Sequence, residues 1–573
     1  MMAIILLAQP LGFAADPAVV PTEQGYVRGV VTSKTRMWRG IPFAEPPVGS
    51  DRWQSPRPAK PWTPAVLDAT QFGHNCLQSG HSVDMGWPQP RSTLSEDCLT
   101  LNVYSGPAGA SPAPVLFWIY GGGFQGGGGN ETRLNGTWDT ALMRGELVVV
   151  TSNYRLGAFG FAASSALAAR ETALAGEARG SGNYGLLDQR AAMKWTQANI
   201  AAFGGDPSRV FIVGQSAGAF SVSEHLVRPA SWGLFAAAGM ESGAFYAGME
   251  CPTLASSDPK WKAYVAAAGC AHATDPTECV VALPADAILN LTDRGWGNEP
   301  WDSPVIDGID LVAPGPTLAA EGKVAPVPIL IGGVEEDISA FDDSPHYPCT
   351  RDDFVKVARD YGFTEAEADA LAGQYATDPL RPGRDPDQLW CDRIHHAGAD
   401  AWSNCPARRL ADWYRVKQQP AWWYKWSYVP NGPNGAQGGH LAHHSVEQPF
   451  IFHVLAETDE ERKEDKGMYF IDPTEVHFSE RIVRAWAAMA ASGNPNARDA
   501  SSVGWLPFNS STHGSALLIG GGAGSPGTFN ATNNFLQAKC DLFDAVFSER
   551  MRGQRGPLRV VKPWMTTESE RRD

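Results

Sequence analysis

The sequence predicts an α/β fold, in which a large, mostly parallel, twisted central sheet carries helices on both of its faces. Residues 115–120 and 147–153 are continuous apolar runs, as in strands that are buried on both faces. A helical pattern follows at 185–203, and a third strand follows at 209–213. Strands that alternate with helices pair in parallel, so their carboxyl ends meet at one edge of the sheet. We expect the chemistry at that edge.

The helix expected at 185–203 places apolar residues on one face. The residues at spacings of three and four are Leu187, Ala191, Trp195, Ala198 and Ala202. The run Gly204-Gly205-Asp206-Pro207 ends this helix, because glycine and proline disfavour its continuation. The chain has no internal repeat and no low-complexity linker, so residues 16–573 are expected to form a single domain.

The composition excludes several classes of protein. The chain has 573 residues, of which 43% are hydrophobic and 19% are charged, as in ordinary globular proteins. Its 46 basic and 62 acidic residues give a formal net charge of −16, which repels nucleic-acid phosphates and anionic lipid headgroups. No run of about 18 apolar residues predicts a membrane span. We therefore expect no nucleic-acid partner and no stable membrane insertion, and the oligomeric state stays open.

Several features favour secretion. Residues 1–15 resemble a secretory leader, with an apolar start and small residues near the expected cleavage site at Ala14 or Ala15. Glycosylation tripeptides begin at Asn130, Asn135, Asn290, Asn509 and Asn530. Nine cysteines allow at most four disulfides and leave one thiol. The spacing suggests Cys76 with Cys98 and Cys270 with Cys279 as pairs, and no Cys-x-x-Cys motif indicates zinc or redox chemistry.

The third strand leads directly into Gly214-Gln215-Ser216-Ala217-Gly218, and a helical stretch follows. A nucleophile elbow requires this setting, because its serine occupies a sharp turn between a strand and a helix. Small residues on either side let the neighbouring backbone approach the turn. Ser216 is therefore the candidate nucleophile, and an ordinary structural turn is the competing interpretation.

A glycine-rich turn follows the strand at 115–120. Gly122 and Gly123 lie there, and their backbone N–H groups would stabilise a developing oxyanion together with the N–H group of Ala217. These three residues are the candidate oxyanion hole. An ordinary loop is the alternative, because residues 126–129 are also all glycine.

Further segments occur in a fixed order along the chain. They are residues 39–44 (RGIPFA), 95–103 (SEDCLTLNV), 118–124 (WIYGGGF), 182–189 (GNYGLLDQ) and 203–207 (FGGDP). With the elbow, this series resembles the type-B carboxylesterase/lipase family, which is the cholinesterase-like and fungal-lipase-like branch of the α/β-hydrolases. The resemblance implies the α/β-hydrolase fold and a serine esterase that acts on a small-molecule ester substrate.

The resemblance also supplies the other two catalytic residues. A strand-like segment at 328–332 precedes the acid segment, in which Asp337 matches the catalytic carboxylate. Glu336 is the alternative, because the family's acid pair usually ends in Glu before Gly, whereas here Glu336-Asp337 precedes Ile338. His444 matches the catalytic imidazole. The order Ser216, Asp337, His444 is the order of the α/β-hydrolases.

A metal site is the competing interpretation of the histidines. His440, His443, His444 and His453 lie close together in the sequence, but no nearby cysteine or paired carboxylate completes a ligand set. The resemblance implies two-step acyl transfer that requires no metal or organic cofactor.

Specificity is less constrained by the sequence. Cys76 and Cys98 would close a loop that resembles the family's flap, and Trp87 and Pro88 lie in it near the position of the choline-binding Trp of cholinesterases. Gln215 replaces the acidic residue that is common before the nucleophile, which removes a charge that would hold a quaternary cation. The flap also looks shorter than that of fungal lipases, so we expect soluble or small esters.

The resemblance extends to the disulfides and leaves other functions open. It implies a long bridge between Cys405 and Cys540, leaves Cys349 with Cys391 as a further pair, and makes Cys251 the odd thiol. The alternatives are a lipase acting on long-chain acylglycerols and a catalytically silent, cholinesterase-like binding or adhesion protein. An intact Ser216 and His444 favour the enzyme.

Overall fold

The computed structural model describes residues 16–78, 93–107, 111–131, 134–245, 251–292, 301, 303–341, 349–378, 389–430, 442–454, 475–496, 504–509, 514–520, 528–552 and 554. The strands of its large sheet are β3 (Val30–Val31), β4 (Arg36–Pro42), β8 (Thr100–Ser105), β9 (Ala113–Ile119), β10 (Val148–Ser152), β11 (Gly205–Gln215), β12 (Ala237–Glu241), β13 (Ile329–Val334), β14 (Ala421–Trp426), β15 (Ala516–Gly520) and β16 (Thr528–Thr532). Two small sheets contain β1 (Val19–Thr22), β2 (Gly25–Arg28) and β5 (Val66–Asp68), and β6 (Asn75–Cys76) and β7 (Leu94–Ser95).

Helices lie between and around these strands. They are α1 (Thr137–Leu142), α2 (Gly157–Phe161), α3 (Ser165–Ala175), α4 (Tyr184–Asn199), α5 (Ala217–Leu226), α6 (Leu254–Ala267), α7 (Pro276–Val281), α8 (Ala285–Thr292), α9 (Gly315–Ala320), α10 (Arg351–Asp360), α11 (Glu365–Tyr375), α12 (Leu389–Ala399), α13 (Cys405–Val416), α14 (Gln448–Ile451), α16 (Val476–Ser492) and α17 (Gln537–Met551). Short helical turns of other types are η1 (Gly49–Asp51), η5 (Ile200–Phe203), η6 (Pro229–Ser231), η8 (Asp337–Phe341) and the π-helical turn η10 (Asp400–Asn404).

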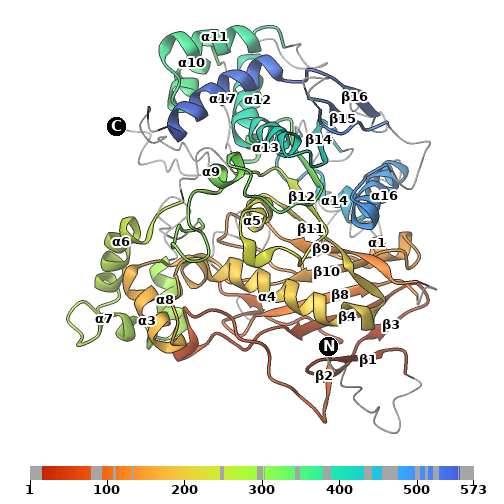
Figure 1. Cartoon of the computed structure of the whole chain (residues 1–573), viewed down its shortest axis with the longest axis vertical. Helices are drawn as coiled ribbons and strands as arrows, with labels where there is room; N and C mark the ends of the chain where they lie inside the picture. Colours follow the sequence, from red (N-terminus) through yellow and green to blue (C-terminus); the bar gives the residue numbers. More distant parts are fainter. Residues whose placement is uncertain are drawn as a thin grey trace.

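The large sheet is mostly parallel, as expected from the sequence (Figure 1). Its strands follow the order β16-β15-β14-β13-β12-β11-β9-β10-β8-β4-β3. Neighbouring strands from β15 to β10 pair in parallel, whereas β16 at one edge and β8, β4 and β3 at the other pair antiparallel. Strands β9 to β14 are buried along almost their whole length, because helices cover both faces of the sheet.

The predicted elements occur close to their expected bounds. The runs at 115–120 and 147–153 form β9 and β10, and the strand expected at 209–213 is the centre of the longer β11. The helix expected at 185–203 is α4, which continues as the turn η5. Gly204 ends it in the left-handed conformation, with a φ of 92°.

The predicted apolar face of α4 is wrong. Leu187 is only half-buried and Ala198 is exposed, whereas Leu186 and even Asp188 are fully buried. The carboxylate of Asp188 accepts two hydrogen bonds of 2.7 Å from the guanidinium of Arg155, which compensates for its burial. Because polar side chains are paired inside the protein here, the apolar periodicity does not identify the buried face.

The four disulfides of the structure join the cysteines that were expected to pair. They are Cys76–Cys98, Cys270–Cys279, Cys349–Cys391 and Cys405–Cys540, and Cys251 is a free thiol. Within the described residues, no helix is both long and apolar enough to cross a membrane. The expected leader at 1–15, Trp87, Pro88 and His440 lie outside the described residues.

Candidate active site

Ser216 forms the sharp turn between β11 and α5. Its backbone has φ 57° and ψ −125°, a conformation that costs free energy for any residue with a side chain. Its N–H group donates a 2.9 Å hydrogen bond to the carbonyl oxygen of Glu241, at the end of the neighbouring strand β12. An added Cβ at Gly214 would lie 2.6 Å from Gly218, and one at Gly218 would lie 2.0 Å from the carbonyl oxygen of Ile119. The turn thus has the close approaches that a nucleophile elbow requires.

The glycine-rich turn after β9 packs directly against this elbow. An added Cβ at Gly121 would lie 2.9 Å from Cβ of Ser216, so this position has no room for a side chain. Gly122 and Gly123 follow with φ values of 105° and 60°. Their N–H groups take part in none of the backbone hydrogen bonds between the described residues. They are thus available to an acceptor beside Ser216, as is expected of an oxyanion hole.

His444 lies against Asp337, which follows β13 at the same edge of the sheet. Nδ1 of His444 lies 2.5 Å from Oδ1 of Asp337, and both side chains are buried. The neighbouring Glu336 points elsewhere: its Oε2 accepts a 3.1 Å hydrogen bond from the backbone N–H of Ala442, and its Oε1 faces Nε2 of His396 at 3.0 Å. The geometry therefore favours Asp337 over Glu336 as the partner of the imidazole.

The other oxygen of Asp337 is also held in place. The hydroxyl of Ser403, in the π-helical turn η10, donates a 2.5 Å hydrogen bond to Oδ2 of Asp337. In the same turn, the ring of Trp402 meets the imidazole of His444 edge-on at 6.5 Å between centroids, and it packs against Phe220 of α5. The turn η10 thus orients the acid and forms an aromatic wall beside the base.

Gln215 also contacts the imidazole, although the sequence indicated it only as the residue in place of an acid. Its Nε2 lies 3.1 Å from Nε2 and 3.4 Å from Nδ1 of His444, and its Oε1 accepts a 2.9 Å hydrogen bond from Gln448. With Nδ1 donating to Asp337, Nε2 of His444 carries its lone pair toward Gln215 and the Ser216 side of the site. This tautomer is the one that a general base needs.

Two buried glutamates lie beneath the elbow. Glu241 is fully buried and accepts a 2.8 Å hydrogen bond from Nε1 of Trp486. Burial, together with the charge of the nearby Glu447, raises the pKa of Glu241 well above its usual range. Glu241 is therefore protonated at neutral pH, so it adds no negative charge next to Ser216.

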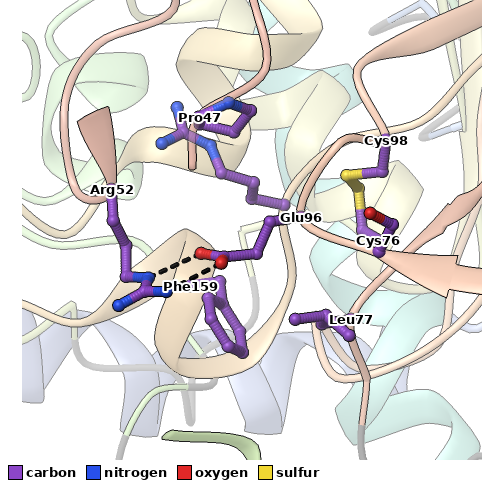
Figure 2. Close-up of a pocket in the computed structure, with 9 residues that line it drawn as sticks. Pro47, Arg52, Cys76, Leu77, Glu96, Cys98 and Phe159 are labelled. Atoms are coloured by element: carbon purple, nitrogen blue, oxygen red, sulfur yellow. Dashed lines mark hydrogen bonds and ion pairs between the residues drawn. A yellow bond between two sulfur atoms is a disulfide. The ribbon is translucent and has the colours of Figure 1, made fainter. Parts of the chain in front are cut away.

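The base of the disulfide loop is anchored by a buried ion pair (Figure 2). Nε and Nη2 of Arg52 lie 2.5 Å and 2.7 Å from the two carboxylate oxygens of Glu96, two residues before Cys98. The same guanidinium donates to the carbonyl oxygen of Val281 at the end of α7. This bidentate contact beside the Cys76–Cys98 bond fixes both ends of the flap loop to the body of the protein.

The histidine cluster is dispersed in the structure. Nδ1 of His443 faces the carbonyl oxygen of its neighbour His444 at 2.9 Å, and Nδ1 of His453 faces the hydroxyl of Ser479 at 2.8 Å. Within the described part of the chain, one group has three side chains close enough to share a metal ion. It consists of Glu335, Glu336 and His396.

Comparison with known proteins agrees with this geometry. The sequence profile described as "Carboxylesterase family" matches residues 16–540. The chain belongs to the carboxylesterase family. It is 31% identical to the para-nitrobenzyl esterase of Bacillus subtilis (strain 168) over 505 residues, which cover 87% of this chain and 94% of that protein. This carboxylesterase is thus a carboxylic ester hydrolase with the α/β-hydrolase fold, as its sequence implies.

Other relatives agree with this assignment. The carboxylesterase is 30% identical to the cholinesterase of Mus musculus, over 88% of this chain and 84% of that protein. It is also 30% identical to the acetylcholinesterase of Bungarus fasciatus, over 86% and 81% of the two chains. A solved structure of PNB esterase superposes with a TM-score of 0.72 at 29% identity, covering 92% of this chain and 99% of that one.

Proposed function

We propose that this carboxylesterase hydrolyses esters with Ser216 as nucleophile, His444 as general base and Asp337 as the acid that orients the base. The observation that carries the proposal is the 2.5 Å contact between Nδ1 of His444 and Asp337, beside the strained elbow at Ser216. Asp337 holds the imidazole in the tautomer whose Nε2 can accept a proton, and its charge stabilises the imidazolium that forms.

The reaction proceeds in two acyl-transfer steps. His444 takes the hydroxyl proton of Ser216 while Oγ attacks the ester carbonyl, and the imidazolium then protonates the departing alcohol. Water attacks the resulting acyl-enzyme with His444 again as the base, which releases the acid and restores the hydroxyl of Ser216.

The negative charge of each tetrahedral intermediate falls on the former carbonyl oxygen. We assign its stabilisation to the N–H groups of Gly122, Gly123 and Ala217, which flank Ser216 from two segments. Each such donor contributes about 3 kcal/mol to lowering the barrier. The absence of side chains at the two glycines lets the substrate carbonyl approach the backbone.

The natural substrate in this proposal is a small, soluble ester without a positive charge. Gln215 and the protonated Glu241 remove two negative charges that would attract a cationic leaving group. Trp402 and Phe220 supply an apolar wall for the acyl or alcohol chain. A lipase for long-chain acylglycerols is the alternative, and a sharp rise in rate at the solubility limit of a triglyceride would favour it.

We further propose that the protein is secreted and acts as a single domain over residues 16–573. Its four disulfides support an oxidising compartment, because such bonds persist there and are rare in the cytosol. Peptide mapping of the exported protein without reduction tests both the compartment and the pairing.

The first test is hydrolysis of short-chain and long-chain p-nitrophenyl esters by the wild type and by Ser216→Ala, together with labelling by an organophosphate. We expect activity and label in the wild type, and the loss of both in the variant. A folded wild type with neither activity nor label would instead support a binding protein that retains the triad residues.

A further inference from the structure

His396, on α12, lies between two carboxylates. Its Nε2 is 3.0 Å from Oε1 of Glu336, and its Nδ1 is 3.5 Å from Oδ2 of Asp378. A neutral imidazole has one N–H group and one lone pair, so one of these carboxylates would face a lone pair. An imidazolium donates to both. Only 12% of the His396 side chain is exposed, so water does not substitute for the missing donor.

The charged groups around His396 favour the same state. Burial alone lowers the pKa of His396, but the hydrogen bonds to Asp378 and Glu336 outweigh it and raise the pKa to about 9; the charges of Glu336 and Glu335 act in the same direction. On the far side, Nζ of Lys539 in α17 lies 2.6 Å and 2.7 Å from the two oxygens of Asp378. The guanidinium of Arg393, in α12, donates to the carbonyl oxygen of Asp378.

Glu336 connects this charge chain to the segment that carries the catalytic imidazole. The N–H of Glu336 donates a 3.1 Å hydrogen bond to the carbonyl oxygen of Ala442, and Oε2 of Glu336 accepts a 3.1 Å bond from the N–H of Ala442. Ala442 is fully buried and lies two residues before His444. The orientation of the Glu336 carboxylate therefore determines where the His444 segment sits.

We propose that His396 is a positioning residue for the reaction. As an imidazolium it holds Glu336 in the orientation that clamps Ala442, and thereby keeps His444 in reach of Asp337 and Ser216. This inference rests on the proposed triad. It extends that triad to a chain of opposite charges that runs from α17 through Lys539, Asp378, His396 and Glu336 to the catalytic segment.

The sign of the pH dependence follows from this assignment. A histidine whose pKa is raised in the folded protein stabilises it fully below the unfolded value of about 6.5, and this stabilisation is lost as the pH rises through the folded value. The clamp is therefore intact at neutral pH and is released as the pH rises through about 9. The kcat of the wild type falls over the same range.

The test compares the wild type with His396→Gln and with the matched control His477→Gln, since the His477 side chain is 84% exposed. For His396→Gln we expect kcat for a p-nitrophenyl ester to fall about tenfold at pH 7.5, through misplacement of the base, with KM within about twofold. Its kcat no longer decreases near pH 9, whereas the control keeps that limb. A folded His396→Gln variant with wild-type kcat and an unchanged alkaline limb would overturn the proposal.

Two further measurements keep the test decisive if His396→Gln fails to fold. Asp378→Asn removes one of the two charges that favour the imidazolium, so the alkaline limb moves about one pH unit lower; a limb that stays in place or moves higher contradicts the proposal. The melting temperature of Asp378→Asn relative to the wild type needs no activity. We expect its deficit to be largest at pH 7 and to shrink above pH 9, and a constant deficit counts against the imidazolium. Retained esterase activity in Ser216→Ala would refute the proposed triad instead.

Discussion

Gln215→Glu places a carboxylate against the catalytic imidazole. In the wild type, Nε2 of Gln215 lies 3.1 Å from Nε2 of His444, and its Oε1 already accepts a hydrogen bond from Gln448. A glutamate of the same length keeps that acceptor and presents its second oxygen to the imidazole. We expect a folded variant in which the charged form of His444 is strongly favoured.

The size of the effect follows from the distance. Two unit charges 3.1 Å apart interact by about 5 kcal/mol at an effective dielectric constant of about 20. Burial of the new carboxylate offsets part of this, so the acidic limb of the kcat/KM profile should move about one to three pH units higher. On the limb itself, each unit lowers kcat/KM about tenfold at a fixed pH, because the reaction requires the neutral base.

The assay is the profile of kcat/KM for a neutral p-nitrophenyl ester between pH 4 and pH 10. Gln215→Met, which removes the amide without adding charge, is the control and should leave the limb close to its wild-type position. The same glutamate should raise the ratio of rates for a choline ester over its neutral isostere. An acidic limb that does not move in Gln215→Glu would refute the placement of this side chain beside the base.

Three further outcomes are expected. Asp337→Asn should lower kcat about 10⁴-fold, because the imidazole loses its orienting charge, whereas Glu336→Gln should cost about tenfold; steady-state kinetics that reverse this order would exchange the two roles. Asp188→Asn leaves the guanidinium of Arg155 buried without its charged partner and should cost about 3–5 kcal/mol of unfolding free energy in urea titration, with a loss below 1 kcal/mol contradicting the pairing. A chelator such as EDTA should leave ester hydrolysis unchanged, and a loss that Zn²⁺ restores would revive the metal-dependent mechanism.

The parts of the site that can be predicted from the sequence are those carried by short, local patterns. Ser216 stands out because strand, glycines and helix are contiguous, and the fold class follows from apolar runs separated by a helix. Glu336 and Asp337 are adjacent, and the sequence alone does not choose between them. The choice depends on backbone direction in η8, which turns one carboxylate toward His444 and the other toward Ala442.

The supporting residues carry no comparable signal. Ser403 lies 66 residues from Asp337, and Gln448 lies 233 residues from Gln215, so only the folded chain brings these pairs together. The order of the strands is likewise set by crossovers that span much of the chain. The face of α4 could not be predicted because its buried ion pairs violate the rule that charged residues lie outside.

The position of Lys539 bears on when the enzyme becomes active during its synthesis. Ser216, Asp337 and His444 leave the ribosome long before α17, which supplies Lys539 to Asp378 and Cys540 to Cys405. A nascent chain therefore holds all three catalytic side chains while the helices around α12 still lack their last support (Figure 1). Full activity arises only after the C-terminal helix has docked, which protects the cell that makes the protein from premature hydrolysis of its own esters.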